Sequence, residues 1–309
     1  MSVIAFFVAC INVQISHAES DGAYSIPAEL AIHSLLTDAA QVGSLMVVVG
    51  ERGHILSSRD NGLTWRQARV PTRVLLTGVH MFDEQLGWAV GLDATIVRTL
   101  DGGLTWQLQY SDPDNQEPLL DVWFKDDKTG LALGAYGLFL TTQDGGEQWQ
   151  PQRLSEDDDF HLNKMLALES GQWLIAAEAG MIYRSGDQAE TWEALDSPYH
   201  GSFFGGLALG GSRTWLFGLR GHAFYSDDAG DSWTIVETGT QVMLTSALKS
   251  QAGDCYLGGL GGVLLINKGC DGQDFEIQQF EGRKGISALL ESNGVILLVG
   301  EAGIQRWVP

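Results

Sequence analysis

An eight-residue pattern recurs five times along this chain at an almost constant spacing. Its clearest copy is Thr99–Trp106, and it reads Ser/Thr-x-Asp-x-Gly-x-Thr-Trp. The copies end at Trp65, Trp106, Trp149, Trp192 and Trp233, so the steps between them are 41, 43, 43 and 41 residues. A period this steady predicts one supersecondary unit used again and again, which restricts the chain to a repeat architecture.

The polar residues of the pattern have the chemistry of a tight turn. Ser, Thr and Asp side chains accept hydrogen bonds from backbone N–H groups across a reversal, and Gly permits a positive φ. The tryptophan offers a large apolar face for the contact between neighbouring units. We therefore interpret the aspartates as structural. The remaining pattern residues are Ser58, Asp60, Gly62, Thr99, Asp101, Gly103, Thr142, Asp144, Gly146, Ser185, Asp187, Ser226, Asp228 and Gly230.

A second signal precedes each turn: a hydrophobic run that ends in Gly-x-x-Gly or a close variant. It occurs seven times, and the sixth unit has a divergent turn with Phe275 in place of the tryptophan. One unit predicts strands at Leu119–Phe124, Leu131–Leu133 and Leu138–Thr141, with a fourth beginning near Trp149. Four antiparallel strands repeated seven times predict an all-β, seven-bladed β-propeller.

The seventh unit ends at Pro309, before any turn or outer strand. Residues Tyr24–Leu30 precede the first unit, and we expect them to supply the missing strand. That pairing of the two chain ends would close the ring and remove an exposed edge. The propeller is then a single domain over residues 19–309.

Residues 1–18 resemble an export signal. Val3–Val13 is an apolar core, and Ser16–Ala18 resembles a small-x-small cleavage site. Such a signal predicts a periplasmic protein. A lipoprotein site at Cys10 is a weaker alternative. The two remaining cysteines, Cys255 and Cys270, could form a disulfide in an oxidising compartment.

The formal net charge of −21 argues against a nucleic acid or an anionic membrane as the direct ligand, because both require a cationic face. No His/Cys cluster has zinc spacing, and the acidic run at 156–159 lacks the alternating oxygen ligands of a calcium loop. We predict neither a metal nor a cofactor.

The repeated turn is the Asp-box, or BNR repeat, of sialidases and other glycoside hydrolases. Combined with the Gly-x-x-Gly signature, it resembles the photosystem II stability/assembly factor family over nearly the whole mature chain. That resemblance implies a non-enzymatic, chaperone-like propeller that binds a membrane-protein precursor. The family's positively charged face has no evident counterpart here, because Arg73, Arg220, Arg283 and Lys284 are scattered among many acids. We expect a monomeric, periplasmic relative that assists a membrane complex such as an efflux or export system.

A binding face is expected where the outer strand of one blade leads to the inner strand of the next, because these connections vary in length at one end of the channel. The candidate residues on it are Arg73, Asp114, Glu117, Asp158, His161, Tyr199, His200, Arg283 and Lys284.

Two alternatives remain open. A glycoside hydrolase needs two carboxylates across a sugar, which 39 acidic residues neither show nor exclude. A sialidase would also need three converging arginines, and no motif places them. A carbohydrate-binding propeller would bind a glycan without turnover.

Overall fold

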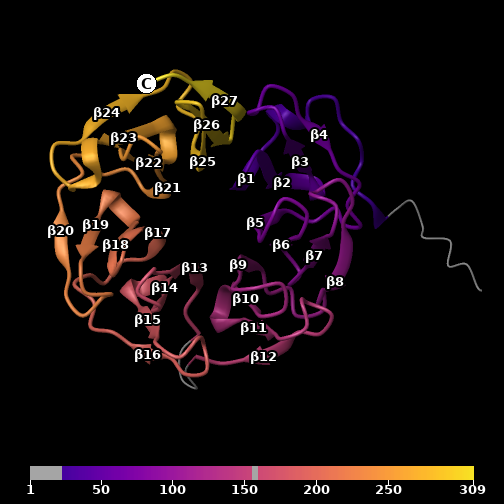
Figure 1. Ribbon diagram of the computed structural model, residues 1–309, viewed down its shortest axis with the longest axis horizontal. Coiled ribbons are helices and arrows are strands. Elements are labelled where there is room, and N and C mark those ends of the chain that lie inside the picture. Colours follow the sequence, from indigo (N-terminus) through magenta and orange to yellow (C-terminus); the bar gives the residue numbers. More distant parts are fainter. Residues whose placement is uncertain (1–22, 155–158) are drawn as a thin grey trace, which may run out of the picture.

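The computed structural model describes residues 23–154 and 159–309, and these form a ring of seven antiparallel sheets (Figure 1). The predicted signal peptide lies outside the described residues. The first strand of every sheet lies next to the central channel, and later strands lie progressively further out. The all-β, seven-bladed propeller predicted from the repeat is confirmed.

Six blades have four strands and the seventh has three. The strands are β1 (Leu36–Val42), β2 (Leu45–Gly50), β3 (Ile55–Ser58) and β4 (Arg66–Gln67); β5 (Leu76–Met81), β6 (Gly87–Gly91), β7 (Ile96–Thr99) and β8 (Gln107–Tyr110); β9 (Leu119–Phe124), β10 (Gly130–Gly134), β11 (Phe139–Thr142) and β12 (Gln150–Gln152); β13 (Leu162–Ala167), β14 (Trp173–Ala177), β15 (Ile182–Ser185) and β16 (Glu193–Ala194); β17 (Phe203–Gly210), β18 (Arg213–Gly218), β19 (Ala223–Ser226) and β20 (Thr234–Val236); β21 (Leu244–Lys249), β22 (Cys255–Gly259), β23 (Val263–Asn267) and β24 (Glu276–Gln279); β25 (Ile286–Ser292), β26 (Val295–Gly300) and β27 (Gly303–Trp307).

Short 3₁₀ turns complete the element list. They are η2 (Ala31–His33), η3 (Glu51–Gly53), η4 (Ala135–Gly137), η5 (Glu178–Gly180), η6 (Leu219–Gly221), η7 (Leu260–Gly262) and η8 (Lys268–Cys270). All but η2 and η8 occupy the Gly-x-x-Gly segment between the second and third strands of a blade.

The second strand of each blade is covered on both faces by the neighbouring blades. The strand β2 is therefore an unbroken run of buried residues, Leu45–Gly50, whereas outer strands such as β12 are exposed. This burial explains why the second strands read as continuous apolar runs rather than alternating patterns. Burying that apolar surface between blades is the main source of stability in a fold with so little helix.

The Gly-x-x-Gly signature has a steric cause at both glycines. A Cβ on Gly50 would lie 2.3 Å from the Leu35 carbonyl oxygen at the start of the inner strand. A Cβ on Gly180 would lie 1.9 Å from the Tyr199 carbonyl oxygen, and Gly180 has a φ of +80°. The absence of a side chain at the first glycine therefore allows the inner strand to lie close to it. At the second glycine it allows the close approach of the connection to the next blade.

Each Asp-box tryptophan packs against the blade that precedes its own. Trp106 is 4% exposed and lies in one apolar cluster with Val47 and Val70 of the first blade and Leu76 of the second. Phe275 takes this role in the sixth blade, with its ring 5.8 Å from that of Trp215. In the seventh blade Trp307 packs on Phe280 of the sixth, with the ring centroids 6.0 Å apart.

The expected closure of the ring by strand pairing is wrong. Residues Tyr24–Leu30 lie along the outer edge of the first blade instead, where Ser25 N–H donates to Val70 O at 2.8 Å and Gln67 Nε2 donates to Ile26 O at 3.0 Å. The outer strand β4 is only two residues long, so the free backbone groups beyond it accept the N-terminal segment. In the described part of the chain, β27 pairs only with β26.

The ends of the ring still meet, through side chains. Strand β1 packs on β25 and β26 through a shared apolar cluster that includes Met46 and Leu297. At the rim, Asn61 accepts hydrogen bonds from Arg306 Nη1 and from Ser292 Oγ, both at 2.7 Å. The first and seventh blades are therefore joined like any other neighbouring pair.

Candidate functional site

The up-and-down order of the strands gives the ring two different ends. One end carries the turns between second and third strands and the connections between blades; we call it the connection face. In every blade the first residue of that turn donates its N–H to the carbonyl just before the inner strand, as Glu51 does to Leu35 at 3.0 Å. The opposite end, the Asp-box face, carries the Asp-boxes and the turns between first and second strands.

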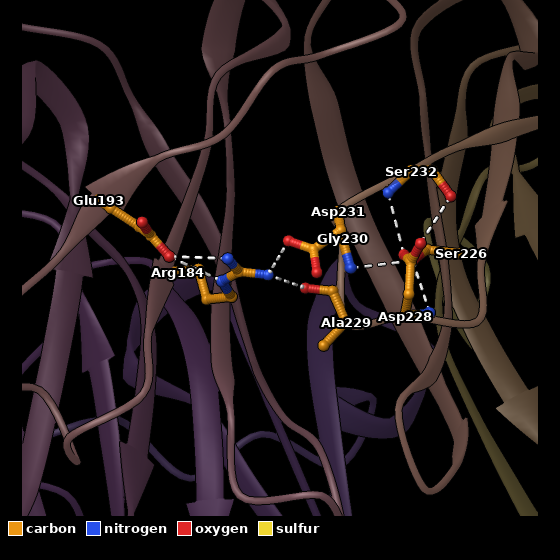
Figure 2. Close-up of polar contacts among 8 residues, drawn as sticks. All are labelled: Arg184, Glu193, Ser226, Asp228, Ala229, Gly230, Asp231 and Ser232. Atoms are coloured by element: carbon orange, nitrogen blue, oxygen red, sulfur yellow. Dashed lines mark hydrogen bonds and ion pairs between the residues drawn. The ribbon is translucent and has the colours of Figure 1, made fainter.

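The Asp-box aspartates are fully engaged in their own turns. Asp228 accepts from Ser226 Oγ at 2.8 Å, from Ser232 N–H at 2.9 Å and from Ser232 Oγ at 2.6 Å (Figure 2). These hydrogen bonds, led by that from the Ser232 hydroxyl, lower the pKa of Asp228 to about 2. The equivalent bonds likewise lower the pKa values of Asp60 and Asp187 to about 2. The carboxylates of these aspartates are therefore used within their own turns, in agreement with the structural role predicted for them.

Three arginines each donate a hydrogen bond to a backbone carbonyl in the Asp-box of the next blade, and we call these contacts arginine staples. Arg184 on β15 donates to Ala229 O at 3.3 Å and forms ion pairs with Glu193 and Asp231 at 2.8 and 2.6 Å (Figure 2). Arg98 on β7 and Arg306 on β27 occupy the same strand position in their blades. They donate to Gly145 O at 2.9 Å and to Asn61 O at 2.7 Å.

The repeat pattern did not predict these contacts, although the sequence carries a signal for them. Arg98 and Arg184 each stand one residue before the Ser or Thr that opens an Asp-box. The third strand ends at its own Asp-box, and the long side chain of an arginine near that end reaches the box of the next blade. The role of Arg306 follows only from the closed ring.

The connection face receives the candidates that the structure describes. Arg283, Lys284 and His200 are exposed, while Glu117 and His161 are half-buried. Arg73 is exposed, and its Nε donates to Tyr24 O at 2.6 Å. Asp158 lies outside the described residues. The candidates share one end of the ring but come from different inter-blade connections, so they form a ring-shaped band rather than one cluster.

Tyr199 and His200, which are adjacent in the sequence, point in different directions. The Tyr199 ring turns inward and stacks on His222, with centroids 4.5 Å apart, and its hydroxyl donates to Leu219 O at 3.1 Å. His200 points to solvent. A separate aromatic contact joins the third and fourth blades, where the ring of Tyr136, 61% exposed, lies 4.9 Å from that of His161.

The wall of the central channel is bonded from blade to blade. At the second position of the inner strand, Thr37 Oγ1 donates to Leu76 O and Thr77 Oγ1 donates to Leu119 O, both at 2.6 Å. At the third position, carboxylates accept from the next blade: Asp38 from Val79 N–H at 3.0 Å and Asp121 from Met165 N–H at 2.8 Å. These bonds fix the register of one blade on the next.

Four titratable groups lie together in this wall: Asp38, His80, Asp121 and Lys164. Lys164 Nζ is 2.8 Å from Asp121 Oδ1. Burial raises the pKa of Asp38, although Lys164 opposes it. Burial alone would lower the pKa of Lys164, but the Asp121 and Asp38 carboxylates outweigh it and raise that pKa above its ordinary value. Burial lowers the pKa of His80 to about 4, and its buried Nε2 has no described hydrogen-bond partner.

The repeat pattern did not predict the channel cluster either. Asp38, Asp121 and Lys164 occupy the same position in three inner strands, two residues after the strand begins. Aligning the units on their inner strands rather than on their turns would have shown these charges facing a common axis. Asp38 and Lys164 line the channel cavity, which has a volume of about 460 Å³.

The cysteine pair lies in the sixth blade, away from the channel. Cys255 on β22 and Cys270 in η8 form a disulfide with an S–S distance of 1.98 Å. The bridge ties the divergent Asp-box turn to the second strand. Across residues 23–154 and 159–309, no group of three or more His, Cys, Asp or Glu side chains is placed to hold a metal ion. The same residues contain no helix long and apolar enough to span a membrane.

Fold and turn chemistry together define the chain as a seven-bladed Asp-box propeller. The family model described as "Photosynthesis system II assembly factor YCF48" matches residues 58–195 and, in a second overlapping match, residues 108–277. These matches cover more than half of the chain, and the chain belongs to that family. The photosystem II assembly protein Ycf48 of Thermosynechococcus vestitus is 37% identical over 43 residues, which is 14% of this chain and only 12% of that protein.

Solved structures share the whole ring. A structure of YCF48 bound to D1 peptide superposes with a TM-score of 0.70 at 19% identity, covering 90% of this chain and 94% of that one. YCF48 from Cyanidioschyzon merolae gives a TM-score of 0.70 at 14% identity, with 93% and 99% covered. The WD40 propeller of Doa1 gives the same TM-score at 13% identity, with 88% and 92% covered. At these identities the likeness establishes the fold and leaves the ligand to other evidence.

Proposed function

We propose that this protein is an exported, non-enzymatic assembly factor that binds an extramembrane segment of a membrane-protein subunit on its connection face. Membership of the photosystem II assembly factor family carries the proposal. A structure of the relative YCF48 holds a D1 peptide, which supports a segment of a membrane protein as the ligand class here. The disulfide between Cys255 and Cys270 supports an oxidising compartment such as the periplasm.

The connection face suits an extended protein segment. Its exposed cations Arg52, Arg220, Arg283 and Lys284 are spread over several blades, and large apolar side chains stand beside them. Leu92, Tyr136 and Leu260 are exposed by 38%, 61% and 42% at three of the turns. A band that mixes exposed apolar groups with separated charges fits a chain lying across the ring better than a compact small molecule.

In-cell crosslinking followed by affinity capture and mass spectrometry tests this proposal. The tag belongs in the turn at Gly171 on the Asp-box face, where the space around the residue is open. We expect enrichment of one integral membrane complex, with crosslinks to connection-face residues. A photosystem II subunit would place the protein in the family's named role, and an efflux or export component would place it in another assembly pathway.

A matched pair of variants separates the two faces. Arg283→Ala/Lys284→Ala removes two exposed cations from the connection face, and Lys125→Ala/Lys128→Ala removes two from the Asp-box face. We expect the first pair to reduce capture and the second to leave it unchanged. Equal capture by both, or recovery of glycans instead of protein, would contradict the proposal and favour a carbohydrate-binding propeller.

A further inference from the structure

The lining of the central channel combines charged, polar and large apolar side chains. Its charged groups, Asp38 and Lys164, come from the first and fourth blades, and its large apolar groups, Phe204, Phe217 and Met243, come from the fifth and sixth. A cavity of about 460 Å³ lies within the range of small-ligand sites, which combine apolar walls with a few placed polar groups. Its ligand should therefore have an apolar stem and a charged head.

The titratable groups at the channel determine the sign of that charged head. Asp38 and Lys164 line the cavity, and the buried carboxylate of Asp121 lies behind them, close to both. Lys164 is paired with Asp121 at 2.8 Å, but among the described residues no lysine or arginine lies within ion-pair distance of Asp38. Asp38 receives backbone N–H bonds alone, from Val79 at 3.0 Å among them. The carboxyl group of Asp38 thus has no cation of its own at the channel.

The position of Asp38 makes it accessible from the face proposed to bind the partner. Inner strands begin at the connection face, and Asp38 is the third residue of β1. At about 3.4 Å per residue, its carboxylate lies one or two residues below that mouth of the channel. The side chain of a lysine or arginine in a segment lying over the mouth is long enough to enter, with its stem along Phe204 and Met243.

We propose that the channel mouth is a binding site for an alkylammonium or alkylguanidinium group, supplied by a lysine or arginine side chain of the bound protein segment. Its cation pairs with Asp38 and completes a balanced set of two carboxylates and two cations. The strongly negative chain favours approach of such a ligand. The choice of a side chain as the source rests on the proposed assembly function; the site itself does not.

The first experiment uses free ligands and the full, oxidised protein. Butylguanidinium, butylammonium and butyrate are titrated by calorimetry and by ¹H–¹⁵N NMR, with the Val79 amide as the reporter because it donates to Asp38. We expect both cations to bind and to shift the Val79 amide, and butyrate to do neither. Butyrate binding in preference to the cations, or no binding of either cation, would overturn the site.

Two charge-neutralising variants assign the effect. Asp38→Asn keeps an acceptor for Val79 and should weaken cation binding tenfold or more, as expected for loss of a charge-assisted hydrogen bond. Asp227→Asn removes an exposed carboxylate in the fifth Asp-box and should change the affinity for the cations less than twofold. If Asp38→Asn does not fold, the Val79 shift in the unaltered protein still decides the question.

Capture of the membrane partner by Asp38→Asn tests the source of the cation. Reduced capture, with the Asp227→Asn protein unaffected, supports a side chain of the bound segment. Unchanged capture together with weakened butylguanidinium binding overturns the side-chain source and indicates a free amine. If the unaltered protein captures no partner but still binds the cations, the assembly function fails while the channel site stands.

Discussion

Arg306 Nη1 donates a hydrogen bond to the Asn61 carbonyl oxygen at 2.7 Å, although the two residues are 245 positions apart in the chain. The bond joins β27 of the last blade to the first Asp-box. It repeats the geometry of Arg98 with Gly145 and of Arg184 with Ala229. The first and seventh blades are therefore joined by the same arginine-to-carbonyl contact that joins two other pairs of neighbouring blades. Among the described residues they share no strand.

Removing this staple should weaken the ring at its closure. Arg306→Ala loses a charge-assisted hydrogen bond that is open to solvent, so we expect a loss of about 1 kcal/mol in the free energy of unfolding. Chemical denaturation measures it. Arg220→Ala, an exposed arginine on the connection face, serves as the control and should change stability by less than about 0.5 kcal/mol. Equal effects of both variants would contradict a closing role for Arg306.

Trp106 should be among the most costly single positions to truncate. It is 4% exposed between the first and second blades. Trp106→Ala is expected to lower the free energy of unfolding by about 3 kcal/mol through lost burial and the cavity left behind. Trp106→Phe retains most of the contact and should cost less. An unchanged melting temperature for the alanine variant would rule out the blade-packing role.

The disulfide should contribute through the loop that it closes. Cys255 and Cys270 are separated by 15 positions, for which loop-closure entropy corresponds to about 3 kcal/mol. Cys255→Ala/Cys270→Ala should lose that amount in thermal or chemical unfolding. A reductant should destabilise the unaltered protein and leave the double variant unaffected. Equal sensitivity of both proteins to the reductant would contradict this assignment.

The Asp-boxes should make the fold sensitive to strong acid. The pKa values of Asp60, Asp187 and Asp228 are about 2 in the folded protein, below the ordinary value of 3.8. Their stabilisation is complete above about pH 4 and is lost as the pH falls toward 2. Asp228→Asn should be less stable at pH 7 and lose less stability between pH 4 and 2. Asp227→Asn, a neighbouring control, should follow the unaltered protein.

His80 should cause a separate loss of stability at milder pH. Its pKa of about 4 lies below the ordinary 6.5, because burial favours the neutral ring. Below about pH 6.5 the unfolded chain binds a proton at this histidine, whereas the folded protein does not until about pH 4. The free energy of unfolding therefore falls across this window, by up to about 3 kcal/mol. His80→Gln should flatten the stability curve in this window, as measured by urea unfolding. His33→Gln, at an exposed site, should retain the slope.

Sequence reasoning reached the fold because propeller blades are nearly local objects. The spacing from Trp65 to Trp233 reports a single repeated unit, and the turn residues report where each unit reverses. The third blade shows the accuracy: the predicted strand Leu119–Phe124 is β9, and the predicted third strand lies within one residue of β11. The prediction for the N-terminal segment was wrong, because this segment could pair with the outer edge of either the first or the seventh blade. Only the positions of these two edges in space decided between them.

The candidate binding residues that the structure describes lie at the end of the ring that strand order predicts, but their contacts were not predicted. Strand order alone puts Arg283, Lys284 and His200 on the connection face. Whether Tyr199 faces solvent depends on His222, a residue from a turn 23 positions later that comes to lie beneath it. The position of Tyr199 in a loop therefore predicted more exposure than its side chain has.

What the sequence determined by itself was the repeat, its turn chemistry and hence the seven-bladed ring. These follow from short-range hydrogen bonds and from apolar runs that are legible within each unit. Only the tertiary structure decided how the ring closes and which charges share the channel. Arg306 with Asn61, and Asp38 with Lys164, are brought together by ring geometry, since each pair joins different blades and neither member signals the other in the sequence.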